Sequence, residues 1–139
     1  MTEKIRARVI LADDHPGVVE DLRAVLEPEF EVVATVGDGN ALVAAAETLA
    51  PDVIVTDIAM PGLNGIAAAG EILRRNPAAR VVFVTVHSDP EVVQKGLAIG
   101  ALGYVLKLTA GDDLVPAIRA VLRGKRHLSP TVGASDRSM

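Results

Sequence analysis

Asp57 is the residue in this sequence best placed to do chemistry. It follows the apolar run 53–56 and precedes a loop rich in proline and glycine, as a side chain does at the carboxyl end of a buried strand. Asp13 and Asp14 end another apolar run in the same way, and Lys107 ends a third. If these strands are parallel neighbours, three acids and one amine meet at one edge of a sheet. Clustered carboxylates favour a divalent cation, and together with an amine they suit a phosphoryl group.

Each of these residues also has an ordinary structural interpretation. Asp13 and Asp14 could merely cap the helix that follows them, and Asp57 could be a turn residue. Thr85 could be a strand former at the end of a valine-rich run, and Lys107 could be a solvated charge. Their joint occurrence at the same ends of successive runs favours a site, because unrelated residues would be scattered over both ends.

The composition excludes several kinds of site. The 139 residues include no cysteine, which excludes disulfides, thiolate metal sites and cysteine nucleophiles. A formal charge of −4 argues against a general nucleic-acid surface, and an aromatic content of 2% leaves no platform for stacking bases. The sequence contains neither a long uncharged apolar segment nor a signal peptide. We therefore expect one cytoplasmic domain that has no membrane partner.

Five short, almost continuously apolar runs predict strands that are covered on both faces: 8–13, 31–36, 53–57, 81–85 and 103–107. Segments with helical periodicity alternate with them, at about 16–27, 40–50, 65–76, 90–99 and 112–123. Asn40 is a candidate N-cap for the second of these helices. The strict alternation predicts an α/β fold, a doubly wound five-stranded parallel sheet flanked by five helices. Only the chain from Gly124 onward looks like a linker.

Four segments carry motifs whose combination and order are highly specific. They are Leu-Ala-Asp-Asp-His-Pro at 11–16, Thr-Asp-Ile-Ala-Met-Pro-Gly-Leu-Asn-Gly at 56–65, Val-Thr at 84–85, and Gly-Ala-Leu-Gly-Tyr-Val-Leu-Lys at 100–107. In these motifs the chain resembles the receiver domain of bacterial two-component response regulators, a family with a flavodoxin-like fold. The resemblance covers roughly residues 6–125. It implies a receiver domain over residues 1–125 and a linker or tail over 126–139.

The resemblance implies a signalling switch rather than an enzyme, although such a domain takes part in its own phosphotransfer and dephosphorylation. A sensor histidine kinase would transfer a phosphoryl group to Asp57. The implied cofactor is Mg²⁺ or Mn²⁺, held by Asp13, Asp14 and Asp57 and by the backbone carbonyl of Ala59. The other implied roles are a switch hydroxyl, a switch aromatic near the surface and a phosphoryl-binding amine, at Thr85, Tyr104 and Lys107. At the rim of the path taken by hydrolytic water, Ala59 and His87 would tune dephosphorylation.

The sequence departs from the family pattern at one position and matches a subfamily at its end. Many receivers have a proline in a cis bond after the lysine, but Leu108 follows Lys107 here. A cis bond before a non-proline residue costs about 3 kcal/mol, which leaves the peptide geometry open. Residues 122–130 resemble the linker of the NarL/FixJ (LuxR-type) subfamily, which leads into a helix-turn-helix domain that binds DNA and controls transcription.

The last residues bear on how the switch would act. Residues 131–139 are too few for a helix-turn-helix domain, so we expect that output domain to be missing here and any DNA contact to need it. The alternative is a stand-alone, single-domain receiver that acts through protein–protein contacts. The fifth helix, or the first with the fifth, could pair two copies in a homodimer.

Two rival functions fit the sequence less well. An Mg²⁺-dependent phosphatase with an aspartyl nucleophile resembles Asp-x-Asp at its nucleophile, but Ala59 stands at the second acid position. A nucleotide-binding domain would need a third glycine where Leu42 stands in the run 37–42, and that run follows the second strand rather than the first. A turn between strand and helix explains the run better.

Overall fold

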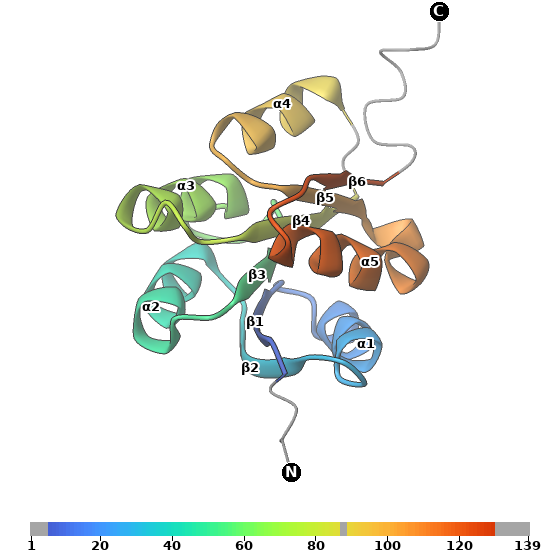
Figure 1. The fold of residues 1–139 in the computed structure, drawn as a ribbon. Helices are drawn as coiled ribbons and strands as arrows, with labels where there is room; N and C mark the ends of the chain where they lie inside the picture. The colour runs from blue at the N-terminus through green and yellow to red at the C-terminus, as the bar shows by residue number, and fades with distance from the viewer. Residues whose placement is uncertain (1–5, 87–88, 130–139) are drawn as a thin grey trace, which may run out of the picture.

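The computed structural model describes residues 6–86 and 89–129 (Figure 1), and within them six strands alternate with five α-helices. The strands are β1 (Arg8–Ala12), β2 (Glu31–Val36), β3 (Val53–Thr56), β4 (Val81–Thr85), β5 (Gly103–Leu106) and β6 (His127–Leu128). The helices are α1 (Pro16–Leu26), α2 (Gly39–Leu49), α3 (Gly65–Arg75), α4 (Pro90–Ala98) and α5 (Ala110–Leu122), with a 3₁₀ turn at Lys107–Thr109. The sheet is parallel, in the order β2-β1-β3-β4-β5-β6. The predicted doubly wound fold is therefore confirmed.

Helices cover both faces of the sheet, which explains the continuous apolarity of its strands (Figure 1). Along β1, Val9 and Leu11 pack into one core with α1 and α5. The alternate residues Ile10 and Ala12 pack into the second core, which α2, α3 and α4 complete. None of these helices, in the part of the chain that is described, is long and apolar enough to cross a membrane.

A capping side chain and a 3₁₀ turn fix where two of the helices begin. Asp38, not the predicted Asn40, is the N-cap of α2, and its carboxylate accepts a hydrogen bond of 2.8 Å from the backbone of Ala41. The helix therefore begins at Gly39. The last helix begins at Ala110, two residues earlier than its periodicity predicts, because the 3₁₀ turn leads directly into it.

The sheet has one strand more than the sequence predicts. Residues 127–128, expected to be linker or tail, pair with the start of β5 in parallel. Asp113 of α5 fixes this strand, because its carboxylate lies 2.8 Å from His127 Nε2 and accepts a hydrogen bond from Ser129 Oγ. The same hydroxyl accepts a hydrogen bond of 3.0 Å from Leu106 N, and Ser129 N donates one of 2.9 Å to Tyr104 O. The chain that leaves the domain is therefore attached to both α5 and β5.

Tyr104 is fully buried, so the expectation that it lies near the surface is wrong for this structure. Its ring packs edge-to-face on Phe83, with 6.1 Å between the ring centroids. Gly96 of α4 leaves room for this pair, since a Cβ there would lie 3.0 Å from the Phe83 ring. Burial raises the pKa of the Tyr104 phenol above its ordinary value, and the negative charges of Asp89 and Asp57 raise it further.

The buried phenol predicts a specific alkaline titration. Tyr104 is the only tyrosine and the chain has no tryptophan, so the ultraviolet absorbance of tyrosinate reports this residue alone. A free phenol ionises at a pH of about 10. The pKa of Tyr104 in the folded protein is higher than that of a free phenol. Burying the neutral phenol should therefore stabilise the fold fully at pH values below about 10, and this stabilisation should decline as the pH rises through the folded-state pKa. Tyrosinate absorbance should therefore appear only as the circular dichroism of the fold is lost.

The control for this titration is Tyr104→Phe, which removes the absorbance change and lowers the dependence of the unfolding free energy on alkaline pH. Ionisation with an ordinary midpoint in protein that keeps its folded circular dichroism would contradict the buried position.

Candidate functional site

The carboxyl ends of the central strands bring the predicted site residues to one edge of the sheet. Asp13 follows β1, Asp57 follows β3, Thr85 is the last residue of β4, and Lys107 follows β5. The chain runs from β1 outward to β2 and then returns past β1 to β3, so β1 and β3 flank the point where the winding reverses. Ligand sites of open parallel sheets lie at that point, next to the carboxyl ends of the strands.

Two buried carboxylates share one ammonium group at this edge. The side chains of Asp13 and Asp57 are 1% and 4% exposed. Lys107 Nζ lies 2.9 Å from Asp13 Oδ2 and 3.0 Å from Asp57 Oδ2. Burial lowers the pKa of Lys107, but its interactions with Asp13 and Asp57 outweigh burial and leave that pKa above its ordinary value. The amine is therefore a stable cation between two acids at neutral pH.

The backbone around Asp57 holds its carboxylate in place. Asp57 N donates a hydrogen bond of 2.9 Å to Ala12 O, and Asp57 Oδ1 accepts one of 2.7 Å from Ile58 N. The loop closes where Gly65 N donates to Ile58 O at 2.7 Å. A Cβ at Gly65 would overlap the carbonyl oxygen of Asp57, so only glycine fits there.

The loop after Asp57 continues to the N-cap of α3. Asn64 accepts a hydrogen bond of 2.8 Å from Ala67 N, which fixes the start of that helix. Gly62 has a φ of +69°, in the region that favours glycine. Ala59, predicted to offer a backbone carbonyl, is exposed in this loop, two residues beyond Asp57.

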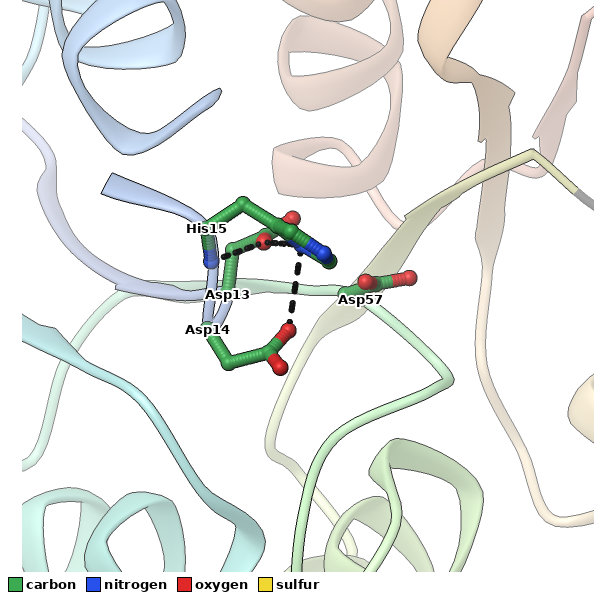
Figure 2. Close-up of side chains that lie close together, drawn as sticks. All are labelled: Asp13, Asp14, His15 and Asp57. Carbon is green, nitrogen blue, oxygen red and sulfur yellow. Dashed lines mark hydrogen bonds and ion pairs between the residues drawn. The ribbon is translucent and has the colours of Figure 1, made fainter. Parts of the chain in front are cut away.

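Asp14 and His15 lie beside Asp13 and Asp57 (Figure 2), and both are exposed to solvent. His15 Nδ1 lies 3.0 Å from Asp13 Oδ1 and 3.1 Å from Asp14 Oδ1. One ligand atom from each of Asp13, Asp14, His15 and Asp57 can be chosen so that all lie within 4.8 Å of one another. His15 has no role predicted from the sequence, where its only signal is its position directly after the acid pair.

The other predicted residues lie around these acids. Thr85 is fully buried at the end of β4, and the next residue, Val86, is 71% exposed. All peptide bonds in the described residues are trans, which includes Lys107–Leu108, and the Leu108 side chain is 93% exposed. His87 lies outside the described residues.

The donor set fits a hard divalent cation. Carboxylate oxygens are the ligands that Mg²⁺ and Mn²⁺ prefer, and three carboxylates cluster here, two of them paired with the same ammonium group. Asp13 Oδ2 is buried without a hydrogen bond and has only its ion pair with Lys107 to balance it among the described residues. An open depression of about 550 Å³, lined in part by Asp13 and Asp14, leads from these acids to solvent. The residues present therefore suit the cation that the sequence predicts.

Comparison with known proteins identifies the family. The family described as the response regulator receiver domain matches residues 9–119. The transcriptional regulatory protein DegU of Brevibacillus brevis is 37% identical over 91% of this chain and 55% of its own length. LiaR of Bacillus subtilis is 37% identical over 90% of the chain and 60% of its own length. The chain thus spans little more than half the length of these curated relatives.

Solved structures agree with this assignment. A LuxR-family two-component response regulator from Aurantimonas sp. SI85-9A1 superposes with a TM-score of 0.90 and 36% identity, covering 97% of this chain and 100% of that one. The isolated receiver domain of RcsB from Salmonella enterica was solved with the phosphomimetic BeF₃⁻. It gives a TM-score of 0.85 at 32% identity, and the match covers 94% of this chain and 98% of that one. In sequence, in fold and in the residues at the carboxyl edge of its sheet, this chain belongs to the receiver-domain family of two-component response regulators.

Proposed function

We propose that this receiver domain accepts a phosphoryl group on Asp57 from a sensor histidine kinase, with Mg²⁺ or Mn²⁺ as its cofactor. The observation that supports this most directly is the carboxylate of Asp57, 4% exposed and 3.0 Å from the Lys107 ammonium at the carboxyl end of a central strand. Asp13, Asp14, Asp57 and the backbone carbonyl of Ala59 would hold the cation. When bound, the cation supplies positive charge against which phosphoryl oxygens are stabilised.

The transfer is a displacement at phosphorus. An oxygen of Asp57 forms a bond to the phosphorus atom, the bond from phosphorus to the donor nitrogen or oxygen breaks, and the donor keeps the electron pair. A carboxylate is a weak nucleophile toward an anionic phosphoryl group unless the charge of that group is neutralised. Lys107 neutralises part of that charge, and the hydroxyl of Thr85 donates a hydrogen bond to a phosphoryl oxygen.

The phosphoryl group then acts as a two-state switch. Drawing Thr85 and Lys107 toward the new dianion changes the packing around Tyr104, which lies on β5 against Phe83 of the neighbouring β4. The surface that responds is formed by α4, β5 and α5. Tyr104 is already buried in this structure. Phosphorylation therefore shifts the balance between a state in which its ring is buried and a state in which its ring is exposed.

The output of the switch is transcription control through a further domain, or contact with a partner protein. The related protein RcsB has been solved as two dimers bound to two parallel DNAs. We propose that this domain likewise forms a homodimer, and that DNA is contacted only through an output domain. The proposed tuning of phosphate loss by Ala59 and His87 stays a prediction.

Phosphorylation should require both Asp57 and a divalent cation. Incubation with acetyl phosphate and Mg²⁺ should add one phosphoryl group, detected by the mass of the intact protein, and a chelator should abolish the addition. Asp57→Asn should remove it, because the amide cannot form the acyl phosphate. The matched control is Asp52→Asn, an exposed acid at the opposite end of the same strand, which should be phosphorylated as wild type. Full labelling of Asp57→Asn would overturn the assignment.

Thr85 should connect phosphorylation to Tyr104. Tyrosine fluorescence comes from Tyr104 alone and should change on phosphorylation. Thr85→Ala should still accept the phosphoryl group but lose most of that change, Thr85→Ser should restore it, and the exposed Thr35→Ala should behave as wild type. An unchanged fluorescence response in phosphorylated Thr85→Ala would show that Thr85 is not the switch.

A further inference from the structure

His15 has an unusual place for a helix-capping residue. It is the N-cap of α1, yet its side chain makes no capping hydrogen bond. Its backbone N–H donates to Asp13 Oδ1 at 2.9 Å, and its imidazole turns back over the acids that precede it (Figure 2). The side chain is 62% exposed, so core packing does not force this orientation. The ring is therefore placed by the carboxylates.

The contact needs a hydrogen-bond donor or a metal ion at His15 Nδ1. His15 Nδ1 faces two carboxylate oxygens, at 3.0 Å on Asp13 and 3.1 Å on Asp14. A bare imidazole nitrogen and a carboxylate oxygen are both acceptors and repel each other at that separation. Either a proton on Nδ1 or a metal ion ligated by it makes the arrangement favourable.

The spacing and the charge of the cluster fit a metal ion. Two ligands at a right angle on an ion with bonds of about 2.1 Å are separated by about 3.0 Å. The distances from His15 Nδ1 to the carboxylate oxygens of Asp13 and Asp14, 3.0 and 3.1 Å, match this separation. Asp57, 4% exposed, and the buried Asp13 Oδ2, which has no hydrogen bond, add negative charge that Lys107 balances only in part.

We propose that His15 Nδ1 is a direct metal ligand and makes the acidic site prefer first-row transition ions over Mg²⁺. Imidazole nitrogen suits the later first-row ions Co²⁺, Ni²⁺ and Zn²⁺, whereas Mg²⁺ takes oxygen ligands almost alone. The added nitrogen therefore raises affinity for the transition ion and leaves affinity for Mg²⁺ nearly unchanged. This inference deepens the proposed function, because it concerns which ion the same acids hold.

The test measures metal binding without any phosphodonor. Co²⁺ and Mg²⁺ are each titrated into metal-free protein by calorimetry, and the visible absorbance and paramagnetic shifts of the His15 ring protons are followed with Co²⁺. In His15→Ala the Co²⁺ dissociation constant should rise about tenfold or more, as expected when one ligand is lost, while that for Mg²⁺ changes less than about twofold. The absorbance of the nitrogen-ligated Co²⁺ should change with it.

The matched control is His127→Ala, which removes a histidine remote from these acids and should bind both ions as wild type. Equal Co²⁺ affinity in wild type and His15→Ala would overturn the proposal, since His15 then only donates a hydrogen bond to the acids. Equal weakening of both ions would also overturn it, because His15 would then merely position the carboxylates. Failure of Asp57 to be phosphorylated would refute the proposed function but leave these binding results unaffected.

Discussion

The shared ammonium of Lys107 is the interaction on which the site depends. Asp13 and Asp57 are almost fully buried, and an isolated charged carboxylate in such a place is strongly unfavourable. One cation between two carboxylates offsets part of the cost of burying them but leaves an excess of negative charge, which Asp14 increases. That imbalance supports the metal ion proposed for this site. It also means that neutralising or adding charge at Asp57 changes the forces on Lys107.

The fold brings the charged residues together away from water, and single residues in the loops adjust their positions. Helices on both faces exclude water from the strands, so the acids sit where charge interactions are strong. The winding of the sheet brings the ends of β1, β3, β4 and β5 together. Gly65 then lets the loop after Asp57 close against its own backbone. Tyr104 lies on β5, and β6 pairs with that strand. Lys107 follows β5 directly, so a movement of Lys107 would act on the strand that holds the chain where it leaves the domain.

Much of the fold and of the site could be predicted from the sequence. The features that could not be predicted depend on contacts between side chains. Asp13, Asp57, Thr85 and Lys107 stand at strand ends that apolar runs mark clearly, so their convergence follows from a parallel sheet. β6 is two residues long and depends on Asp113 contacts that no periodicity records. The burial of Tyr104 depends on the room that Gly96 leaves in α4, and the orientation of His15 depends on the acids beside it. Such contacts between distant residues or between side chains have no signature in a local pattern.

A double-mutant cycle measures how strongly the charges of Asp57 and Lys107 are coupled in the folded protein. The free energy of unfolding in urea is measured without metal for wild type, Lys107→Met, Asp57→Asn and the double variant. Lys107→Met should destabilise the domain, because it leaves two buried carboxylates without a cation. In the Asp57→Asn background the same change should cost less, by at least about 1 kcal/mol. Costs that add within about 0.3 kcal/mol would show that the two groups do not interact and that the site does not depend on this ion pair.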